Sequence, residues 1–321
     1  MWKTIIRRFL ILIPQLLVLS VLIFFLAYFM PGDALRGMVG PDVSADRLHE
    51  LREMHGLNDP WYIQYVRWMT GIITEWDFGR SLSHMRPVTD IVGERLVMTL
   101  RLSILTTFFT YLIAIPLGIL AAKRKGSIID KSIMIYTFIA LSMPTVVLSL
   151  INLLVFSIRL DWFPFGGSVD VTLTAGTFAY FISRIYHLIL PALTLALIST
   201  VSIIYFLRSE IIDYETSDFV TTARSKGVPE NKIYTKHILR NALLPVAGGA
   251  GTVIISLFAG SIFIELVFSY GGMGQLFITS IIQRDFPVAN TLVMFYAIIT
   301  AFAMLLTDIV ITIIDPRIRI K

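Results

Sequence analysis

The 321-residue sequence is 56% hydrophobic and 15% charged, which excludes an ordinary water-soluble fold, in which about a quarter of the residues are charged. Lys and Arg outnumber Asp and Glu by 27 to 22. The arrangement of the basic residues around membrane helices explains this excess, so no nucleic-acid partner is expected. The absence of cysteine excludes disulfides, thiolate metal ligands and a cysteine nucleophile.

Six stretches lack Asp, Glu, Lys and Arg and are long enough to cross a bilayer core about 30 Å thick. Backbone groups in lipid must be paired within their own segment, which favours helices. The sequence therefore predicts an all-α membrane protein with six transmembrane helices. These are Phe9–Met30, Leu102–Ala122, Ser132–Ile158, Tyr186–Leu207, Asn241–Ile264 and Phe286–Thr307. Prolines 116, 144, 191 and 245 lie within these spans or at their ends and predict kinks.

The first span is longer than the apolar region of a signal peptide, and no cleavage site follows it, so we expect a retained anchor. Lys and Arg gather in the N-terminal flank, in the second-to-third and fourth-to-fifth connections, and in the C-terminal tail. These segments fall on one side of the membrane if there are six spans, and the positive-inside rule makes that side the cytoplasm. The sequence thus predicts a multi-pass membrane protein in contact with lipid, with both termini cytoplasmic.

A long external connection, residues 31–101, follows the first span. Its apolar spacing around Trp61–Ile73 predicts an amphipathic helix at the membrane surface. We divide the chain into residues 1–98, which hold the first helix and this external loop, and residues 99–321, a five-helix core. For the third connection, residues 159–185, packing on the outer surface and a re-entrant segment both remain open.

The cytoplasmic connection, residues 208–244, begins with acidic residues and then turns basic. Ser217 or Asp218 is suited to begin a helix, and Gly227 to end it in the left-handed conformation. Pro229 fits the first turn of a second helix. Two short helices hinged at Gly227 indicate a docking element, although a plain solvated loop remains an alternative.

The sequence contains no recognisable catalytic or nucleotide-binding motif. There is no Gly-x-x-x-x-Gly-Lys phosphate loop and no nucleophile–base set. His49 and His55 lack the spacing of a zinc protease site. We therefore expect no catalytic residues, no cofactor and no metal site in this chain, which is not expected to be an enzyme.

Several blocks of residues resemble one family. Asp218–Gly227, followed by His237 and by Leu243-Leu244-Pro245, resembles the EAA motif of bacterial ABC importer permeases of the oligopeptide, dipeptide and nickel group. Further matching blocks cover nearly the whole chain: Arg7-Arg8, Asp77–Ser81, Gly272–Gly274, Arg284–Val288 and Asp315–Arg319. The long first external loop is similar to that of the first permease of the oligopeptide pair. Thr221-Thr222 departs from the Glu-Ala of the motif.

The resemblance implies the type I ABC importer permease fold in a bacterial inner (cytoplasmic) membrane. It implies a second homologous permease, two ABC ATPase subunits that bind ATP and Mg, and an external substrate-binding protein. Peptides are the first expected solute, with nickel chelates or glutathione as alternatives. The residues that it implies for ATPase coupling are Asp218, Thr222, Ala223, Arg224, Gly227, His237 and Pro245.

Small residues in the fifth span, Gly248, Gly249, Gly251 and Gly260, favour an interface with the second permease. Packing of this helix inside one subunit is the alternative. Asn152, Glu265 and Met273 are candidates for the translocation path. An ion-coupled secondary carrier is a competing class, but the sequence has neither the internal repeat nor the mid-membrane acid expected of one. A membrane scaffold or enzyme is a third class, for which the sequence offers no chemistry.

Overall fold

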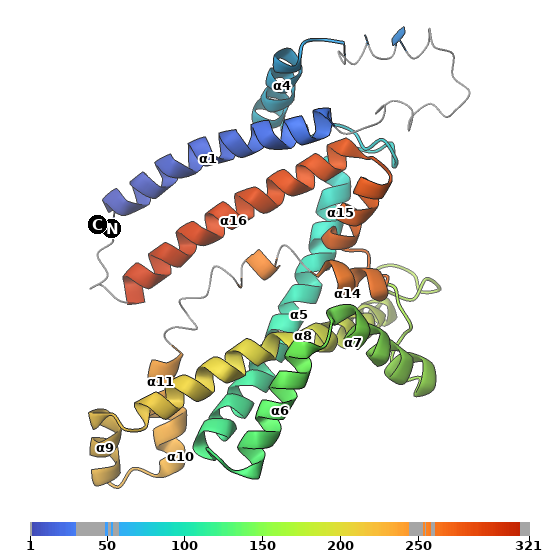
Figure 1. Cartoon of the computed structure of the whole chain (residues 1–321). Helices are drawn as coiled ribbons and strands as arrows, with labels where there is room; N and C mark the ends of the chain where they lie inside the picture. The colour runs from blue at the N-terminus through green and yellow to red at the C-terminus, as the bar shows by residue number, and fades with distance from the viewer. Residues whose placement is uncertain are drawn as a thin grey trace.

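The computed structural model describes residues 2–29, 49–50, 53, 58–243, 253, 255–257 and 261–314 (Figure 1). These residues form helices, connected by turns, and one isolated β-bridge between Arg80 and Pro87. The main helices are α1 (Trp2–Tyr28), α4 (Trp61–Thr70), α5 (Val88–Lys123), α6 (Ile128–Ser142), α7 (Thr145–Asn152), α8 (Phe178–Tyr214), α9 (Asp218–Ser225), α14 (Ile262–Val267), α15 (Met273–Ile282) and α16 (Phe286–Ile314). Shorter segments are η1 (Gly71–Glu75), η2 (Leu153–Arg159), α10 (Glu230–Lys232), η3 (Ile233–Ile238) and α11 (Leu239–Ala242). The expected all-α class is confirmed.

The two helices nearest the chain ends, α1 and α16, lie side by side (Figure 1). Helix α4 packs on the C-terminal part of α1, where the hydroxyls of Ser20 and Tyr65 are 2.7 Å apart. The rings of Phe25 and Trp61 pack with their centroids 5.0 Å apart. The helix predicted around Trp61–Ile73 is therefore present, as α4 and its continuation η1.

Helices α5 and α8 form the central pair and cross in contact along much of their length (Figure 1). Gly118 allows their close approach, because a Cβ there would lie 3.0 Å from Cβ of Leu207. Both helices begin earlier than predicted, α5 at Val88 and α8 at Phe178, so the two external connections are shorter than expected. Helix α5 also runs unbroken through residues 98 and 99, so the two parts into which we divided the chain share one helix.

The predicted third span is not one continuous helix. Helices α6 and α7 are bent by 107° relative to each other. The break falls at Pro144, which has no N–H to donate and forces Met143 into an extended conformation with φ −88° and ψ 122°. Pro116 and Pro191, in contrast, lie inside α5 and α8, which continue past them.

Among the described residues, three helices are long and apolar enough to cross a membrane: α5, α8 and residues 286–307 of α16. The bent α6–α7 pair is a fourth if it forms one span. Shorter apolar segments occur at Leu10–Phe25 in α1 and at Ile255–Val267. Most of the predicted fifth span lies outside the described residues, so the count of six remains a prediction.

The third connection, residues 160–177, contains turns and no helix. It packs on the end of α14, where the N–H of Gly167 donates to the carbonyl oxygen of Phe268 at 2.9 Å. Gly166 is required there, because a Cβ at this position would lie 2.9 Å from the same oxygen. The connection therefore packs on the protein, and its place relative to the membrane remains a prediction.

Candidate functional site

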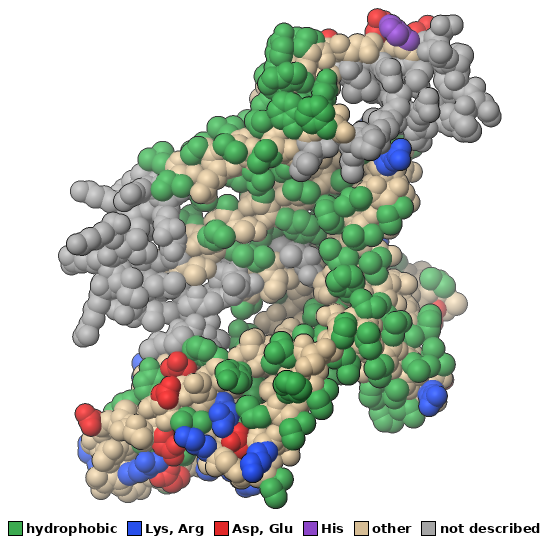
Figure 2. Space-filling view, viewed as in Figure 1, with side chains coloured by type: hydrophobic (Ala, Val, Ile, Leu, Met, Phe, Trp, Pro, Cys, Tyr) green, Lys and Arg blue, Asp and Glu red, His purple; other side chains and the backbone are tan. Residues whose placement is uncertain are grey.

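Charged side chains gather at one end of the molecule, over α9, α10 and the start of α6, whereas apolar side chains are the commonest coloured kind over the rest of the described surface in this view (Figure 2). At this end Gly227 joins α9 to α10 with φ +72°, as predicted. Ser217 precedes α9 in an extended conformation, but its hydroxyl donates to Tyr214 O at 2.6 Å and does not cap the helix. Pro229 lies directly before α10, one position earlier than expected.

The inner face of α9 packs on its own chain. Val220 and Ala223 are buried in an apolar cluster with Ile233 and Ile238 of η3 and Leu207 of α8. The small side chain of Ala223 thus lets α9 lie close to α8 and η3. Asp218, Thr222 and Arg224 are exposed, and His237 is partly buried. The outer face of α9 is therefore available to a partner.

Polar contacts hold the two short helices together around Arg224. Its Nε donates to Glu230 Oε1 at 2.8 Å, and its Nη2 lies 3.6 Å from Glu215 Oε1. The hydroxyl of Tyr234 donates to Glu215 Oε1 at 2.6 Å. The hydrogen bond from Arg224 lowers the pKa of Glu230, while burial and the bond to Glu215 raise the pKa of Tyr234 to about 12.

A second ion pair joins α8 to α6 at the same end. Arg208 donates from Nε and Nη2 to the two carboxylate oxygens of Asp130, at 2.7 and 2.8 Å. Gly126 N also donates to this carboxylate, at 2.8 Å. The Arg208 hydrogen bonds, more than any other contact, lower the pKa of Asp130 against the effect of burial. The ion pair fixes the end of α8, from which α9 continues.

A buried carboxylate lies near the opposite end of α5. Glu265 of α14 is fully buried and accepts a hydrogen bond from Thr99 Oγ1 at 2.8 Å and one from Gln275 N at 2.9 Å. Thr99 in turn accepts from Met273 N at 2.8 Å. These contacts satisfy N–H groups of the first turn of α15, which have no partner within that helix.

The glycine turn before α15 fits closely around this carboxylate. A Cβ on Gly272 would lie 2.3 Å from Glu265 Oε1 and 2.5 Å from Thr99 Oγ1. Gly271 has φ +82°, and its carbonyl oxygen accepts from Arg95 Nη1 at 2.7 Å. The turn at Gly271 and Gly272 is thus built around the Glu265 carboxylate.

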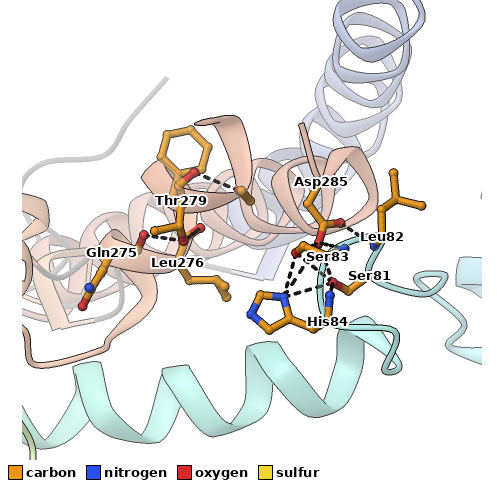
Figure 3. Close-up of polar contacts among 10 residues, drawn as sticks. Ser81, Leu82, Ser83, His84, Gln275, Leu276, Thr279 and Asp285 are labelled. Atoms are coloured by element: carbon orange, nitrogen blue, oxygen red, sulfur yellow. Dashed lines mark hydrogen bonds and ion pairs between the residues drawn. The ribbon is translucent and has the colours of Figure 1, made fainter. Parts of the chain in front are cut away.

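A second buried carboxylate, Asp285, ties the segment before α5 to the start of α16 (Figure 3). It accepts hydrogen bonds from the hydroxyls of Ser81 and Ser83 and from the N–H groups of Leu82 and Ser83, the latter two at 3.1 Å. His84 Nδ1 lies 3.9 Å from Asp285 Oδ2. Burial alone would raise the pKa of Asp285, but these hydrogen bonds outweigh it and hold the pKa below its usual value.

The contact between Ser81 and Asp285 was not predicted from the sequence. Both residues belong to blocks that carry the family resemblance, but they are 204 positions apart. Two signals were available in the sequence. Residues 81–84 form a short, mostly polar segment before one apolar helix, and Asp285 directly precedes a second apolar helix. Neither signal indicates which residues the segment will contact, so only the folded chain shows that the two segments form one cluster.

The three candidate path residues are buried inside the chain. Asn152 donates to Thr194 Oγ1 at 2.9 Å, between α7 and α8. Met273 lies in an apolar cluster with Val88 and Leu292, and Glu265 supports α15 as described above. Each of the three residues thus has a structural contact within the chain, and their role in a translocation path remains a prediction. Pro245, Gly248, Gly249, Gly251 and Gly260 lie outside the described residues.

Comparison with known proteins identifies the family. The profile of the binding-protein-dependent transport system inner membrane component matches residues 114–320, and that of the N-terminal part of such membrane components matches residues 1–104. The chain is 40% identical over 316 residues to the oligopeptide transport system permease protein AppB of Bacillus subtilis, covering 98% of each chain. It is 33% identical to the glutathione transport system permease protein GsiC of Salmonella paratyphi A and 35% identical to a putative peptide permease of Brucella suis, covering 100% and 98% of each chain.

The fold has a solved counterpart. A chain of the MetNI methionine ABC transporter, in an inward-facing crystal form, aligns with a TM-score of 0.55 and 18% identity. The alignment covers 70% of this chain and 96% of that chain, which shows the type I ABC importer permease fold. The family is one of membrane transport subunits and not of enzymes. The chain belongs to the binding-protein-dependent transport system inner membrane components, the permease subunits of ABC importers.

Proposed function

We propose that this permease forms half of the membrane path of an ATP-driven importer of peptides. The observation that carries the proposal is its 40% identity to an oligopeptide permease across 98% of both chains. Glutathione is the second candidate solute, because relatives named as glutathione permeases match the whole chain at 32–33% identity. Nickel chelates are a third candidate, from sequence resemblance alone.

The proposed assembly contains a second homologous permease, two ATPase subunits that bind ATP and Mg, and an external substrate-binding protein. In this assembly the chain crosses the inner membrane six times with both termini in the cytoplasm. The gathering of charges over α9 and α10 supports a cytoplasmic location for that end, because charged side chains are costly in lipid. Gly248, Gly249, Gly251 and Gly260 face the second permease in this proposal.

Helix α9 and the Gly227 turn form the proposed docking element for one ATPase, together with His237 and Pro245. The exposed side chains of Asp218, Thr222 and Arg224 contact the ATPase, while Val220 and Ala223 anchor the helix to α8 and η3. Because the inner face is packed, a displacement of α9 moves η3 and α8 with it as a rigid body. Closure of the ATPase pair is thereby transmitted to the membrane helices.

The first test is to tag the chain, purify it gently from native membranes and identify its stoichiometric partners. Recovery of one similar permease and one or two kinds of ATPase is expected. A homo-oligomer that transports without ATP would contradict the proposal and point to an ion-driven carrier.

The second test concerns the solute. The purified complex, in proteoliposomes with its binding protein, is given labelled oligopeptide, glutathione or nickel chelate, with ATP present or absent. We expect ATP-dependent uptake of the oligopeptide, which an excess of unlabelled peptide reduces. Uptake of glutathione with no uptake of longer peptides would replace the first solute with the second.

A further inference from the structure

Hydrogen bonds join α8 to both arms of the bent α6–α7 pair. Two of these contacts are made by α6, which lies beside α8 (Figure 1). At the start of α6, the carboxylate of Asp130 accepts the two hydrogen bonds from Arg208 described above. Further along α6, the hydroxyl of Tyr136 donates to Leu197 O of α8 at 2.8 Å. The α6 arm is therefore bound to α8 at two levels.

The third contact is made by α7, on the other side of the 107° break. Asn152 Nδ2 donates to Thr194 Oγ1 of α8 at 2.9 Å, and both side chains are buried. Arg208 and Thr194 are 14 positions apart along α8, which is about 21 Å at 1.5 Å per residue. Directional contacts on both sides of the break thus hold the two arms against one helix.

Helix α5 also packs on α6 and α8, but it makes no such contact with them. Ala114 and Ala121 of α5 lie in a buried apolar cluster with Ile133 of α6 and Ile204 of α8. Among the described residues, no hydrogen bond or ion pair joins α5 to α6, α7 or α8. Apolar contacts have no preferred direction, and packed helices can slide past each other along them. Hydrogen bonds therefore bind α6 and α7 to α8, whereas the contact of α5 with α6 and α8 permits sliding.

Helix α8 is also the helix on which the proposed docking element rests. Leu207 of α8 belongs to the buried cluster that holds Val220 and Ala223 of α9. Arg208, the next residue, reaches from α8 to Asp130 of α6. A displacement of α9 therefore acts on α8 directly beside the position at which α8 is bound to α6.

We propose that α6, α7 and α8 move as one rigid unit when α9 is displaced, and that Arg208 and Asp130 are positioning residues that bind α6 into this unit. The inference rests on the proposed function, in which α9 carries the movement of an ATPase. An arginine–carboxylate pair with two parallel hydrogen bonds suits the task, because its two donors fix the geometry as well as the distance. The unit delivers the displacement to α7, on the far side of the break.

The test compares coupling with stability in the complete complex, in proteoliposomes with the binding protein, labelled tri-alanine and ATP. Arg208→Met removes the donors and leaves the Asp130 carboxylate, 4% exposed, without its ion-pair partner. Arg208→Met combined with Asp130→Asn leaves no buried charge, and the carboxamide oxygen can still accept from Gly126 N. The double variant should therefore regain part of the stability that the single variant loses. Asp285→Asn, which removes a buried carboxylate near α15, is the matched control.

We expect the single and the double variant to carry about threefold less tri-alanine per ATP hydrolysed than the wild type, within the range by which single residues change coupling between distant sites. The control should keep the wild-type ratio although it unfolds at a lower temperature. A ratio that recovers together with stability in the double variant would show that the pair only supports the fold, and would overturn the inference. An equal loss of the ratio in Asp285→Asn would do the same.

A distance measurement tests the rigid unit directly. The chain contains no cysteine, so spin labels can be attached to it at chosen positions. Labels on Ser132→Cys of α6 and Asp213→Cys of α8, both exposed, report the distance between the two helices by electron paramagnetic resonance. We expect the wild-type distance to be the same without nucleotide and with ATP and vanadate, and the double variant to show two different distances. A change in the wild type, or no change in the double variant, would overturn the inference.

The outcome for the wild type separates this inference from the proposed function. If the wild-type complex shows no ATP-dependent uptake of peptide or glutathione, the proposed function fails, and the inference fails with it. A wild type that takes up peptide, with variants that keep its transport ratio and its α6–α8 distance, defeats the rigid unit alone.

Discussion

Two groups of acidic residues, at opposite ends of the described helices, are held in different ways. Around α9 and α10, Glu215 and Glu230 pair with Arg224 at the surface, with roughly a third to a half of these side chains exposed. Near α15, Glu265 and Asp285 are at least 99% buried, and hydroxyl and backbone N–H groups are their donors. Within the described residues, no Lys or Arg forms a salt bridge with either of them.

This difference suits the two ends for different tasks. Exposed ion pairs are weak and screened by salt, so they can exchange when a partner binds. A buried carboxylate with several hydrogen bonds holds its donors in one arrangement, because breaking a bond leaves an unpaired buried group. We therefore expect the α9–α10 end to adapt to its partner and the α15 end to keep its geometry. The following predictions test that comparison, from the largest effect to the smallest.

Gly272→Ala is expected to have the largest effect on stability. Its Cβ would overlap Glu265 and Thr99, so the carboxylate must move and lose its hydrogen bonds, at a cost of about 3 kcal/mol or more. The measurement is the thermal unfolding of the purified complex, followed by intrinsic fluorescence. Gly93→Ala is the matched control, since nothing lies within 4 Å of a Cβ at that position of α5. Equal melting temperatures for the two variants would show that the turn is not rigid.

Asp285→Asn is expected to lower stability by about 1–3 kcal/mol, the usual cost of leaving buried donors unpaired. The carboxamide has one acceptor oxygen in place of two, so it cannot accept all the hydrogen bonds from Ser81, Leu82 and Ser83. Chemical denaturation of the complex measures the loss. Asp213→Asn, at an exposed position near the end of α8, serves as the control and should change little.

The effect of Asp285 depends on pH with a definite sign. Its pKa is lower in the folded than in the unfolded chain, so the carboxylate stabilises the fold above the unfolded value, near pH 4. This contribution is lost as pH falls through the folded pKa. The stability difference between wild type and Asp285→Asn should be constant near neutral pH and should shrink below about pH 4. A difference that grows on acidification would contradict the assignment.

Gly227→Val tests the hinge at the α9–α10 end. Gly227 has φ +72°, where a β-branched residue is strained by about 1–2 kcal/mol. Gly126→Val is a close control, because Gly126 has φ +78° and a Cβ meets nothing within 4 Å at either position. Both variants should lose similar stability, but only Gly227→Val should lower the amount of solute carried per ATP hydrolysed. Equal transport ratios in the two variants would remove the hinge from the coupling mechanism.

The smallest effect is expected from Arg224→Gln, which breaks the exposed pair with Glu230. A double-mutant cycle with Glu230→Gln should give a coupling energy near zero at high salt. Arg208→Gln provides the contrast, because Asp130, with 4% of its side chain exposed, would lose its partner while buried. If the Arg224 variant destabilised the complex as much as the Arg208 variant, the two kinds of ion pair would not differ as proposed.

Local rules predicted several elements and missed others for identifiable reasons. The helix at Trp61 and the left-handed Gly227 follow from properties of single residues or of short sequence periods. At Pro144 a kink within one span was expected, and the sharp break between two helices was not. The extension of α5 back to Val88 was missed because Arg95 and Arg101 ended the apolar run that defined the span. A helix needs no uniform hydrophobicity once tertiary contacts cover it, and Val88, Ile91 and Val92 pack against α15 and α16.

By itself the sequence determined the all-α membrane class, because continuous apolar stretches of about 20 residues can satisfy their backbone within one segment in lipid as helices. It also determined the left-handed turn at Gly227, because that turn follows from what the backbone of one residue allows. At Pro144 it predicted a kink, and only the structure showed the 107° break. Only the tertiary structure decided that Ser81 meets Asp285 and that Thr99 meets Glu265. These contacts depend on how helices that are far apart in the sequence pack together, and no local sequence pattern shows which helices will meet.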